Sequence, residues 1–360
     1  MRKSKDSSIT NILKLIAPGT PIRDGLENIL RAKTGALLLI TDNNDIIKKV
    51  VDGGFTINED YTSSKLYELA KMDGAIVLSG DLRKILFANA QLIPSHEIQT
   101  LETGTRHRTA ERTAKQTGEL VISISQRRNI ITVFKGNDRY ILENTDTVLN
   151  KANQAIQTLE KYKKVFDSKL NILNEYEFND IVTLQNVIVA IQRAEMVMRI
   201  ADEIEENIYE LGNDGRLVRM QLEEIVGDLE KEEMLIIKDY MAHKKKKRTA
   251  DEILSELSEI QYEELTKPIT IAKILGYENF DNYDEIGVYP KGYRILNKIP
   301  RMPSNIVENL VESFKSFQHI LAADIESLDD VDGIGEVRAK NIKQALKRMQ
   351  EQFVFDNIII

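Results

Sequence analysis

The sequence contains no cysteine, which excludes disulfide bridges and thiolate metal sites. It has only four histidines in 360 residues, and none follows the His-Glu-x-x-His spacing of zinc hydrolases. It also lacks a Gly-x-x-x-x-Gly-Lys-Ser/Thr loop, so it is not a typical P-loop ATPase or helicase. The absence of cysteine fits a protein of the reducing cytosol.

Long apolar stretches are missing as well. No run of residues approaches the length of about 20 that a membrane-spanning helix needs. Residues Met1–Ser8 are polar and charged, and Ile9–Ile16 is too short and too interrupted for a signal peptide. We therefore expect a cytoplasmic protein that has no membrane partner.

Positive charge is in the minority. The chain has 49 lysines and arginines against 57 aspartates and glutamates, which gives a net charge of −8. A protein with this balance is not a general binder of polyanions, so any contact with nucleic acid requires a local basic patch. With 42% hydrophobic and 29% charged residues, a chain of this length is expected to form two or three soluble domains.

Residues 1–145 alternate short helical and strand patterns, which predicts an α/β domain with a mixed sheet surrounded by helices. Pro21–Arg31 predicts a helix, and the apolar Ala36–Ile40 predicts a buried strand that ends in the Asp42–Asp45 turn. Ile46–Val51 predicts a returning strand. The other expected elements are a turn at Asp52-Gly53-Gly54, a helix that Ser64 caps and that runs to Ala70, and strands at Ala75–Leu78, Ile85–Ala88, Leu120–Ser125, Ile130–Phe134 and Arg139–Leu142.

Residues 146–288 predict an all-α spine domain. Apolar residues recur at steps of three or four from Val148 to Leu173, which indicates a long amphipathic helix with a near-heptad stripe. The basic run Lys244–Arg248 interrupts the helical pattern, either as a solvated linker or as a supplementary DNA contact. Further helices are predicted at Leu184–Leu211, Leu217–Met241 and Ala250–Leu265.

Residues 289–360 contain an internal repeat. The second copy carries Gly333-Ile334-Gly335, where the first copy has Arg301-Met302-Pro303. This pattern predicts an all-α domain of two tandem helix-hairpin-helix units. The repeated apolar residues are Leu296, Ile299, Met302, Val307 and Leu310, and, 32 positions later, Leu328, Val331, Ile334, Ala339 and Ile342.

The Gly333-Ile334-Gly335 turn is typical of a hairpin that binds DNA phosphates. Its glycines let the backbone come close, and the free N–H groups at the following helix start can bind phosphate oxygens without reading the DNA sequence. In the first copy Pro303 is expected as the first helical residue and lacks an N–H group, so Arg301 would contact phosphate through its side chain. The helix after the second hairpin adds positive charge through Arg338, Lys340, Lys343, Lys347 and Arg348.

Two motifs of the first domain indicate nucleotide chemistry. The segment Gly104–Thr109 places three potential cations before a run of helix formers that ends at Gly118. Cations at a helix start are disfavoured by the positive end of the helix dipole. An anion bound at that place would offset the repulsion, because it attracts both the cations and the free N–H groups. Upstream, Asp73-Gly74 adds a carboxylate next to an apolar strand. Each motif also has a simpler interpretation. The Gly104–Thr109 segment would then be a solvated basic turn, and Asp73 would be an ordinary turn residue at a strand end.

The pair Asp73-Gly74-Ala75 and Arg106-His107-Arg108 resembles the signature of the diadenylate cyclase family. With the hairpin Val331–Gly335, the resemblance covers essentially the whole chain and extends to the members that carry a DNA-binding tail. It implies an enzyme that condenses two ATP into cyclic di-AMP with release of two pyrophosphates. Because the product is two-fold symmetric and each chain holds one ATP, the site would form between two facing subunits.

The resemblance also implies roles for individual residues. Asp73 would hold Mg²⁺ or Mn²⁺ near the attacking hydroxyl, and Arg106 and Arg108 would bind phosphate oxygens. His107 would donate to phosphate or order its loop. The other implied ATP contacts are Gly74, Leu92, Thr105, Thr109, Ser125 and Arg128, although Leu92 alone would be a core residue and Ser125 alone a surface hydroxyl.

For the whole molecule the resemblance implies an octamer with face-to-face cyclase domains in the cytoplasm, associated with the nucleoid. It implies that branched, Holliday-junction-like DNA binds and inhibits synthesis, and that recombination or repair proteins are further partners. The alternative function is a non-catalytic DNA-scanning or scaffold protein whose first domain only binds nucleotide. The intact Asp73 argues against that alternative.

Overall fold

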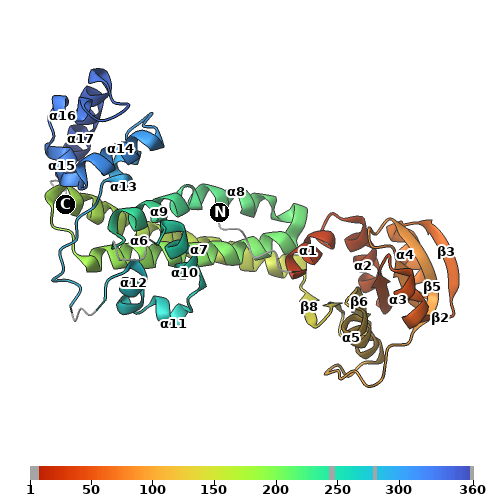
Figure 1. Cartoon of the computed structure of the whole chain (residues 1–360). Helices are drawn as coiled ribbons and strands as arrows, with labels where there is room; N and C mark the ends of the chain where they lie inside the picture. The colour runs from red at the N-terminus through yellow and green to blue at the C-terminus, as the bar shows by residue number, and fades with distance from the viewer. Residues whose placement is uncertain (1–7, 243–247, 279–281, 357–360) are drawn as a thin grey trace. The chain divides into compact units, whose positions relative to one another are not determined.

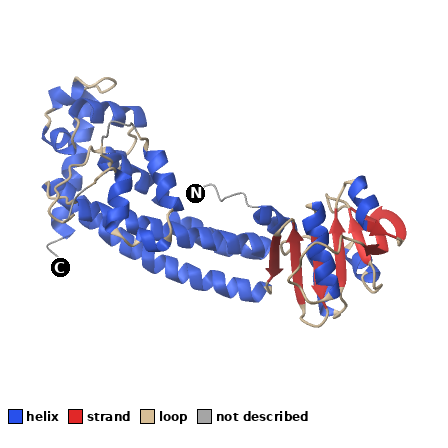
Figure 2. Cartoon of the chain, turned by 60° about the horizontal axis from the view of Figure 1, so that its bottom comes forward, coloured by secondary structure: helices blue, strands red, loops and turns tan. Residues whose placement is uncertain are grey.

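The computed structural model describes residues 8–242, 248–278 and 282–356, with side chains described from residue 11 to residue 352 within these ranges. The chain divides into two compact units. One comprises residues 1–156 and 202–221 and contains the sheet; the other comprises residues 157–201 and 222–360 and is built from helices (Figures 1 and 2). Among the described residues, no helix combines the length and apolar character needed to cross a membrane.

One eight-stranded sheet organises the first unit. β1 is parallel to β4 on one side and antiparallel to β6 on the other. The strand order is β2-β5-β4-β1-β6-β7-β8, with β3 also paired to β5, which confirms the predicted mixed sheet. The strands are β1 Ala36–Ile40, β2 Val51–Asp52, β3 Phe55–Asp60, β4 Ala75–Leu78, β5 Lys84–Leu92, β6 Leu120–Ser125, β7 Ile130–Lys135 and β8 Asp138–Leu142.

Helices cover both faces of this sheet. Leu38 and Ile40 of β1 pack with residues of α2 and α4, whereas Leu37 and Leu39 pack with residues of α3 and α5. Because both faces are covered, every residue of β1 is buried, as its continuous apolar run predicts. The helices of this unit are α1 Ser8–Leu15, α2 Pro21–Arg31, α3 Asn44–Val50, α4 Ser63–Leu69 and α5 Thr105–Thr117.

The predicted strand Ile46–Val51 is wrong, because residues 46–50 belong to helix α3 and only Val51 lies in a strand, β2. The side-chain oxygen of Asn43 accepts hydrogen bonds from the backbone N–H groups two and three residues onward, at 2.9 and 3.4 Å, and so caps a helix. The strand β3 that follows was not predicted from the sequence. Five of its six residues are exposed, so it lacks the apolar alternation that reveals a half-buried strand. Thr62, rather than Ser64, caps α4.

Two long helices follow the sheet in the sequence. α6 spans Thr145–Asn179 and α7 spans Leu184–Leu211, and each contributes residues to both units. The predicted helix Leu217–Met241 is divided at Gly227, whose φ is +45°, and Ala250–Leu265 is also divided. In the basic run Lys244–Arg248, the first four residues lie outside the described residues. The helices are α8 Arg216–Val226, α9 Leu229–Tyr240, α10 Ala250–Glu259, α11 Tyr262–Leu265 and α12 Pro268–Leu275, after the 3₁₀ turn Gly212–Gly215.

The last part of the chain repeats in structure as it does in sequence. α16 and α17 begin at residues 325 and 336, each 32 residues beyond the starts of α13 and α14 at 293 and 304. The repeated apolar residues pack into one core, which fits the predicted tandem hairpins. Pro303 is the residue before α14 rather than its first helical residue. The helices are α13 Tyr293–Asn297, α14 Ser304–Phe314, α15 Phe317–Ala322, α16 Ile325–Asp329 and α17 Glu336–Asp356.

Candidate functional site

The two signature motifs meet at one edge of the sheet. The loop with Asp73 leads directly into β4, and the start of α5 lies at the same edge because the Arg106 side chain reaches Asp73. β6 runs antiparallel to β1, so its final residue, Ser125, lies beside the beginning of β1. The topology therefore gathers the amino ends of β1 and β4, the carboxyl end of β6 and the amino end of α5.

An ion pair joins the two motifs across 33 residues of sequence. Nη2 of Arg106 lies 3.1 Å from Oδ1 of Asp73. The guanidinium also lies against Gly35, where even a methyl side chain would collide with it. The Asp73 carboxylate is fully exposed, whereas the Arg106 side chain is about one-third exposed. Arg106 thus positions an open carboxylate next to the helix start.

Helix α5 begins earlier than the sequence predicts. It starts at Thr105, so Arg106, His107 and Arg108 occupy its first turn, and Thr109 lies one turn inside. The residue before it, Gly104, offers no side chain to cap the helix. The first-turn N–H groups and the two arginines therefore provide positive potential for an anion, as expected for a phosphate site.

His107 is buried, unlike the arginines on either side of it. Its side chain is buried between the sheet and α5, with Nε2 3.2 Å from Oγ1 of Thr132 and Nδ1 3.1 Å from Oγ of Ser123. Burial lowers the pKa of His107 below its ordinary value of 6.5. Because both ring nitrogens are engaged inside the domain, a direct bond to phosphate does not fit this structure. The expected alternative, ordering of the helix start, does fit.

A pocket of about 560 Å³ opens beside the start of α5. Five of the expected nucleotide contacts line it: Thr105, Arg106, His107, Ser125 and Arg128. The Ser125 hydroxyl accepts a 3.1 Å hydrogen bond from the backbone N–H of Arg128, which shapes the turn after β6. The pocket joins hydroxyl donors to guanidinium groups, a combination suited to phosphate or sugar.

The remaining expected contacts lie outside this pocket lining. Arg108 is exposed and Thr109 is half-buried on α5. Leu92 is buried at the end of β5, where it pairs with Val51, so its side chain belongs to the core. Gly74 fits closely against β5, since an added Cβ would lie 2.5 Å from the Cα of Asn89. Its lack of a side chain is thus required by the sheet itself.

Sequence reasoning missed two features of this edge. Gly35 supports the Arg106 guanidinium, and its position just before the buried strand β1 was the available signal. Glu111 of α5 is buried and ion-paired to Lys115 at 2.7 Å, and it also accepts a hydrogen bond from Thr100. These bonds fasten the loop before α5 to the helix. Nothing in the sequence alone marks Glu111 as different from a surface residue.

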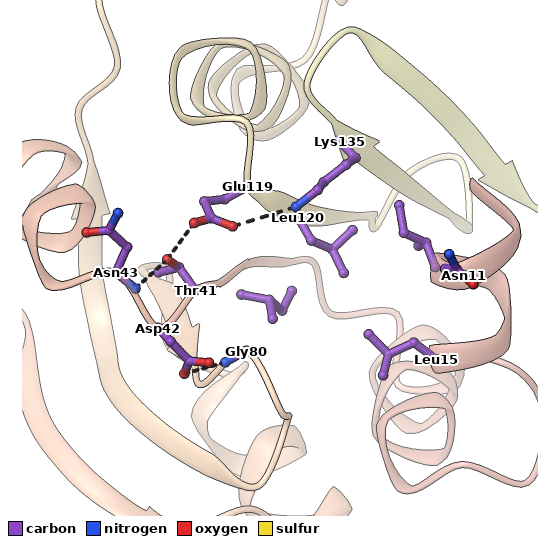
Figure 3. A pocket seen from close by; sticks show the side chains of 11 residues that line it. Asn11, Leu15, Thr41, Asp42, Asn43, Gly80, Glu119, Leu120 and Lys135 are labelled. Atoms are coloured by element: carbon purple, nitrogen blue, oxygen red, sulfur yellow. Dashed lines mark hydrogen bonds and ion pairs between the residues drawn. The ribbon is translucent and has the colours of Figure 1, made fainter. Parts of the chain in front are cut away.

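A second pocket, of about 650 Å³, lies at the opposite end of the central strands (Figure 3). The Thr41 hydroxyl donates to Glu119 at 3.0 Å, and the Gly80 N–H donates to Asp42 at 2.8 Å (Figure 3). Nζ of Lys135 lies 3.7 Å from Glu119. These polar groups bond one another, and none of the expected nucleotide contacts lines the pocket.

The hairpin region has the expected turn geometry. Gly333 has a φ of +80°, and a Cβ there would lie 2.7 Å from Cδ1 of Ile306, so only glycine fits well. Arg301, the equivalent residue of the first hairpin, has a φ of +60°. Both turns therefore share a left-handed residue at the same place, although only one of them is glycine.

The basic candidates after the second hairpin differ in their contacts. Arg338 donates to the carbonyl of Gly333 and so supports the turn, whereas Lys340 is exposed and paired with Glu336. Lys343 donates to the carbonyls of Leu321 and Ala323, at 2.7 and 2.6 Å, and ties α17 to the end of α15. Ile334 is buried in the hairpin core.

A buried polar joint fastens the first hairpin to the long helices of the second unit. The Arg294 side chain of α13 is fully buried and forms an ion pair with the fully buried Glu177 of α6. It also lies 3.3 Å from Glu232 of α9. The Asp239 carboxylate of α9 accepts the N–H groups of residues 292, 293 and 294, at 2.7, 2.7 and 2.9 Å, and so caps α13.

These features define a class of protein with an α/β nucleotide-binding domain and a tandem helix-hairpin-helix DNA-binding domain. Residues 23–139 match the family described as DisA bacterial checkpoint controller nucleotide-binding. Residues 142–283 match the DisA bacterial checkpoint controller linker region, and residues 293–348 match the SAM-like helix-hairpin-helix tandem.

Relatives of known name agree over the full length. The chain is 54% identical over 358 residues to the DNA integrity scanning protein DisA of Clostridium botulinum strain Loch Maree, covering 99% of this chain and 100% of that protein. It is 54% identical to DisA of Clostridioides difficile strain 630 over 347 residues, or 96% of each chain. It is 52% identical to DisA of Clostridium tetani over 360 residues, covering 100% of this chain and 99% of that protein. The chain therefore belongs to the DisA family.

Proposed function

We propose that this chain is a diadenylate cyclase, which condenses two ATP molecules into cyclic di-AMP and releases two pyrophosphates. The observation that carries the proposal is the 3.1 Å ion pair between Arg106 and Asp73. This pair brings the two signature motifs together at one edge of the sheet, beside the 560 Å³ pocket. Membership in the DisA family supports the same activity.

In this reaction the 3′-hydroxyl oxygen of one ATP forms a bond to the α-phosphorus of the other. The hydroxyl loses its proton, and the bond from that phosphorus to pyrophosphate breaks; the same exchange in the opposite direction closes the ring. The protein's task is to align the two nucleotides and to neutralise charge on the phosphates. The start of α5, with Arg106 and Arg108, would bind phosphate, while Thr105 and Ser125 would donate hydroxyl hydrogen bonds.

A divalent metal, Mg²⁺ or Mn²⁺, fits this site as a partner of the substrate. Asp73 offers a fully exposed carboxylate, and the described residues contain no group of three or more metal-ligating side chains. Mg²⁺ in nucleotide enzymes commonly takes one or two carboxylates together with substrate phosphates, so one carboxylate suffices. Bound beside Asp73, the metal would neutralise developing charge on the phosphates.

We extend the proposal to the assembly. Because each chain holds one ATP and both nucleotides react with each other, two subunits would face each other through this edge, and an octamer would contain four such pairs. The hairpin domain would bind DNA phosphates without reading sequence, with a preference for branched, Holliday-junction-like DNA. This activity would place the protein on the nucleoid in the cytoplasm, where recombination or repair proteins are further partners.

We also propose that bound DNA inhibits cyclase activity. Two joints support this coupling, one within each unit. The buried Arg294–Glu177 pair holds the first hairpin to α6, and in the first unit Glu210 of α7 accepts hydrogen bonds from Tyr140 and from the N–H of Glu143, at 2.7 and 3.0 Å. Since α6 and α7 are continuous helices with residues in both units, they can transmit strain between them.

Incubation of the purified chain with ATP and Mn²⁺, followed by mass spectrometry, tests the activity directly. We expect cyclic di-AMP together with two pyrophosphates for each molecule formed. Nucleotide that binds without forming this product would favour the non-catalytic scaffold. Specific activity per chain should also fall on dilution, because facing subunits separate.

A further inference from the structure

Asn89 lies in the middle of strand β5 with a backbone conformation that strands do not normally contain. Its φ is +54°, in the left-handed region. The ladder between β4 and β5 changes register at this point: Ala75 pairs with Ala90, and Val77 pairs with Phe87. Three steps along β5 therefore oppose two along β4, so Asn89 belongs to a β-bulge. Bulges are frequent next to active sites, where they redirect a side chain.

The bulge brings Asn89 against the Asp73-Gly74 motif. A Cβ on Gly74 would lie 2.5 Å from the Cα and carbonyl carbon of Asn89 and 2.7 Å from its Oδ1. The carboxamide thus occupies the space that a side chain at Gly74 would fill, one residue from the exposed carboxylate of Asp73. Asn89 itself is exposed, and in the described part of the chain its carboxamide makes no hydrogen bond.

The chemistry of a carboxamide indicates the ligand group that it would meet. Phosphate calls for cationic donors, which Arg106 and Arg108 supply at this edge. A sugar hydroxyl both donates and accepts a hydrogen bond, and an amide offers one neutral acceptor and one neutral donor. Because the Asn89 carboxamide is uncharged, it would bind the sugar without changing the charge around Asp73.

We propose that the Asn89 carboxamide hydrogen-bonds the ribose hydroxyls of ATP and orients the 3′-hydroxyl next to Asp73. This inference rests on the proposed cyclase function. The simpler interpretation is that asparagine is present only because it tolerates the left-handed region better than most residues. The chain offers an internal comparison for that interpretation: Asn58 of β3 has a φ of +50° and is also exposed, but β5 separates its strand from β4.

Asn89→Gly and Asn58→Gly variants of the full chain test the proposal. Glycine accepts the left-handed conformation, so both variants should fold, with unfolding temperatures close to that of the original chain. We expect Asn89→Gly to lower kcat/KM for ATP by about tenfold, the usual effect of one hydrogen bond, and Asn58→Gly to leave it unchanged. Equal activities of the two variants would overturn the proposal.

A second measurement uses 2′-deoxy-ATP, which lacks one ribose hydroxyl but keeps the attacking 3′-hydroxyl. We expect the original chain to use this analogue less well than ATP, and Asn89→Gly to show a smaller difference between the two substrates. A full, undiminished preference for ATP in Asn89→Gly would refute contact with the 2′-hydroxyl and would thereby overturn the proposed hydrogen bonding to both ribose hydroxyls. If the original chain forms no product from ATP, the proposed function fails first, and this inference fails with it.

Discussion

At the scale of single residues, the signature motifs divide into exposed chemical groups and buried supports. Asp73 and Arg108 are open to solvent, whereas His107 is enclosed by Ser123, Thr132 and the sheet. Exposure predicts that a substitution affects chemistry more than folding, and burial predicts the reverse. The two kinds of residue can therefore be separated by measuring activity and stability on the same variants.

Asp73→Asn should abolish cyclic di-AMP formation, with a loss of at least about a hundredfold, because it removes the negative charge that would hold the metal. The side chain is fully exposed, so the unfolding temperature should stay close to that of the original chain. Product detection by mass spectrometry and thermal unfolding of the same sample check both expectations. Near-normal turnover by the folded variant would remove Asp73 from the reaction.

His107 should make stability depend on pH. Burial holds its folded-state pKa below 6.5, so as the pH falls through that value the unfolded chain takes up a proton that the folded chain does not. The stabilising contribution is complete above pH 6.5 and is lost as the pH falls toward the lower folded pKa.

Unfolding temperatures measured at pH 7.5 and 5.5 check this. The difference should be smaller in His107→Gln, which cannot titrate, than in the original chain. His96 is exposed, so His96→Gln is the control and should keep the original difference. An unchanged difference in His107→Gln would contradict the assignment.

At the scale of elements, sequence periodicity predicted helices and repeats better than it predicted their contacts. The bounds of α7 and the 32-residue repeat were correct because a 3.6-residue pattern and a duplicated core are visible locally. The segment after Asn43 was misassigned because a capping side chain, rather than its apolar pattern, makes it helical. The Arg106–Asp73 pair could not be predicted, since it depends on which strand ends share an edge.

The direction of the His107 side chain could be predicted only with the correct start of helix α5. With α5 beginning at Thr105, residues 107, 110 and 114 lie at steps of three and four and face the sheet together. The sequence-based start near Thr109 left His107 in a loop, where its direction was undetermined. A helix start misplaced by one turn was therefore enough to leave open whether His107 contacts phosphate or orders its loop.

Arg301→Gly should weaken DNA binding without reducing stability. Glycine accommodates the positive φ of this turn, but it removes the side chain that would contact phosphate. The slope of log affinity against log salt should decrease in magnitude by about 0.9 on duplex DNA, as expected for one lost phosphate contact.

Lys315 is the matched control for Arg301. It is also exposed and positively charged, and its backbone is also in the left-handed region, with a φ of +64°. It lies at the carboxyl end of α14, whereas the hairpin turn precedes the amino end of this helix. Lys315→Gly should leave both the affinity and the salt slope unchanged, as measured by fluorescence anisotropy. Equal slopes for the two variants would exclude a phosphate contact by the first hairpin.

The buried joint should contribute strongly to the stability of the second unit. Arg294→Met leaves the Glu177 carboxylate buried without its partner, so we expect a loss of about 3–5 kcal/mol in the free energy of unfolding. The double variant Arg294→Met/Glu177→Met should recover part of this loss. Urea denaturation measures both, and Lys163→Met, at the partly exposed pair with Asp167, should change the free energy by at most about 1 kcal/mol.

At the scale of the whole molecule, the division of the chain into two units determines how coupling can be tested. Residues 202–221 belong to the first unit, and Glu210 bonds Tyr140 and Glu143 there. A chain cut near residue 145 would lose these contacts, so its activity would not report on the intact domain. Substitutions that remove DNA binding from the full chain are therefore the better test of coupling between DNA binding and cyclase activity.

Gly335→Glu provides such a substitution. No atom lies within 4 Å of a Cβ at Gly335, and its φ is not positive, so glutamate fits without strain. Its carboxylate at the hairpin turn should repel DNA phosphates and greatly weaken binding. Gly287→Glu adds the same charge at another open position of the second unit, beside Thr183 and before the first hairpin begins at α13, and should leave DNA binding unchanged.

With these variants, DNA should inhibit the cyclase only where it can bind. We expect cyclic di-AMP formation by the original chain and by Gly287→Glu to fall when DNA is added, more with a four-way junction than with linear duplex. Gly335→Glu should keep its full rate in both conditions. Two nucleotides must align for the reaction, so a displacement of about 1 Å transmitted along α6 and α7 could cost roughly a hundredfold in rate. Rates that do not change with DNA in a chain that binds it would show that the hairpins only localise the enzyme on the chromosome.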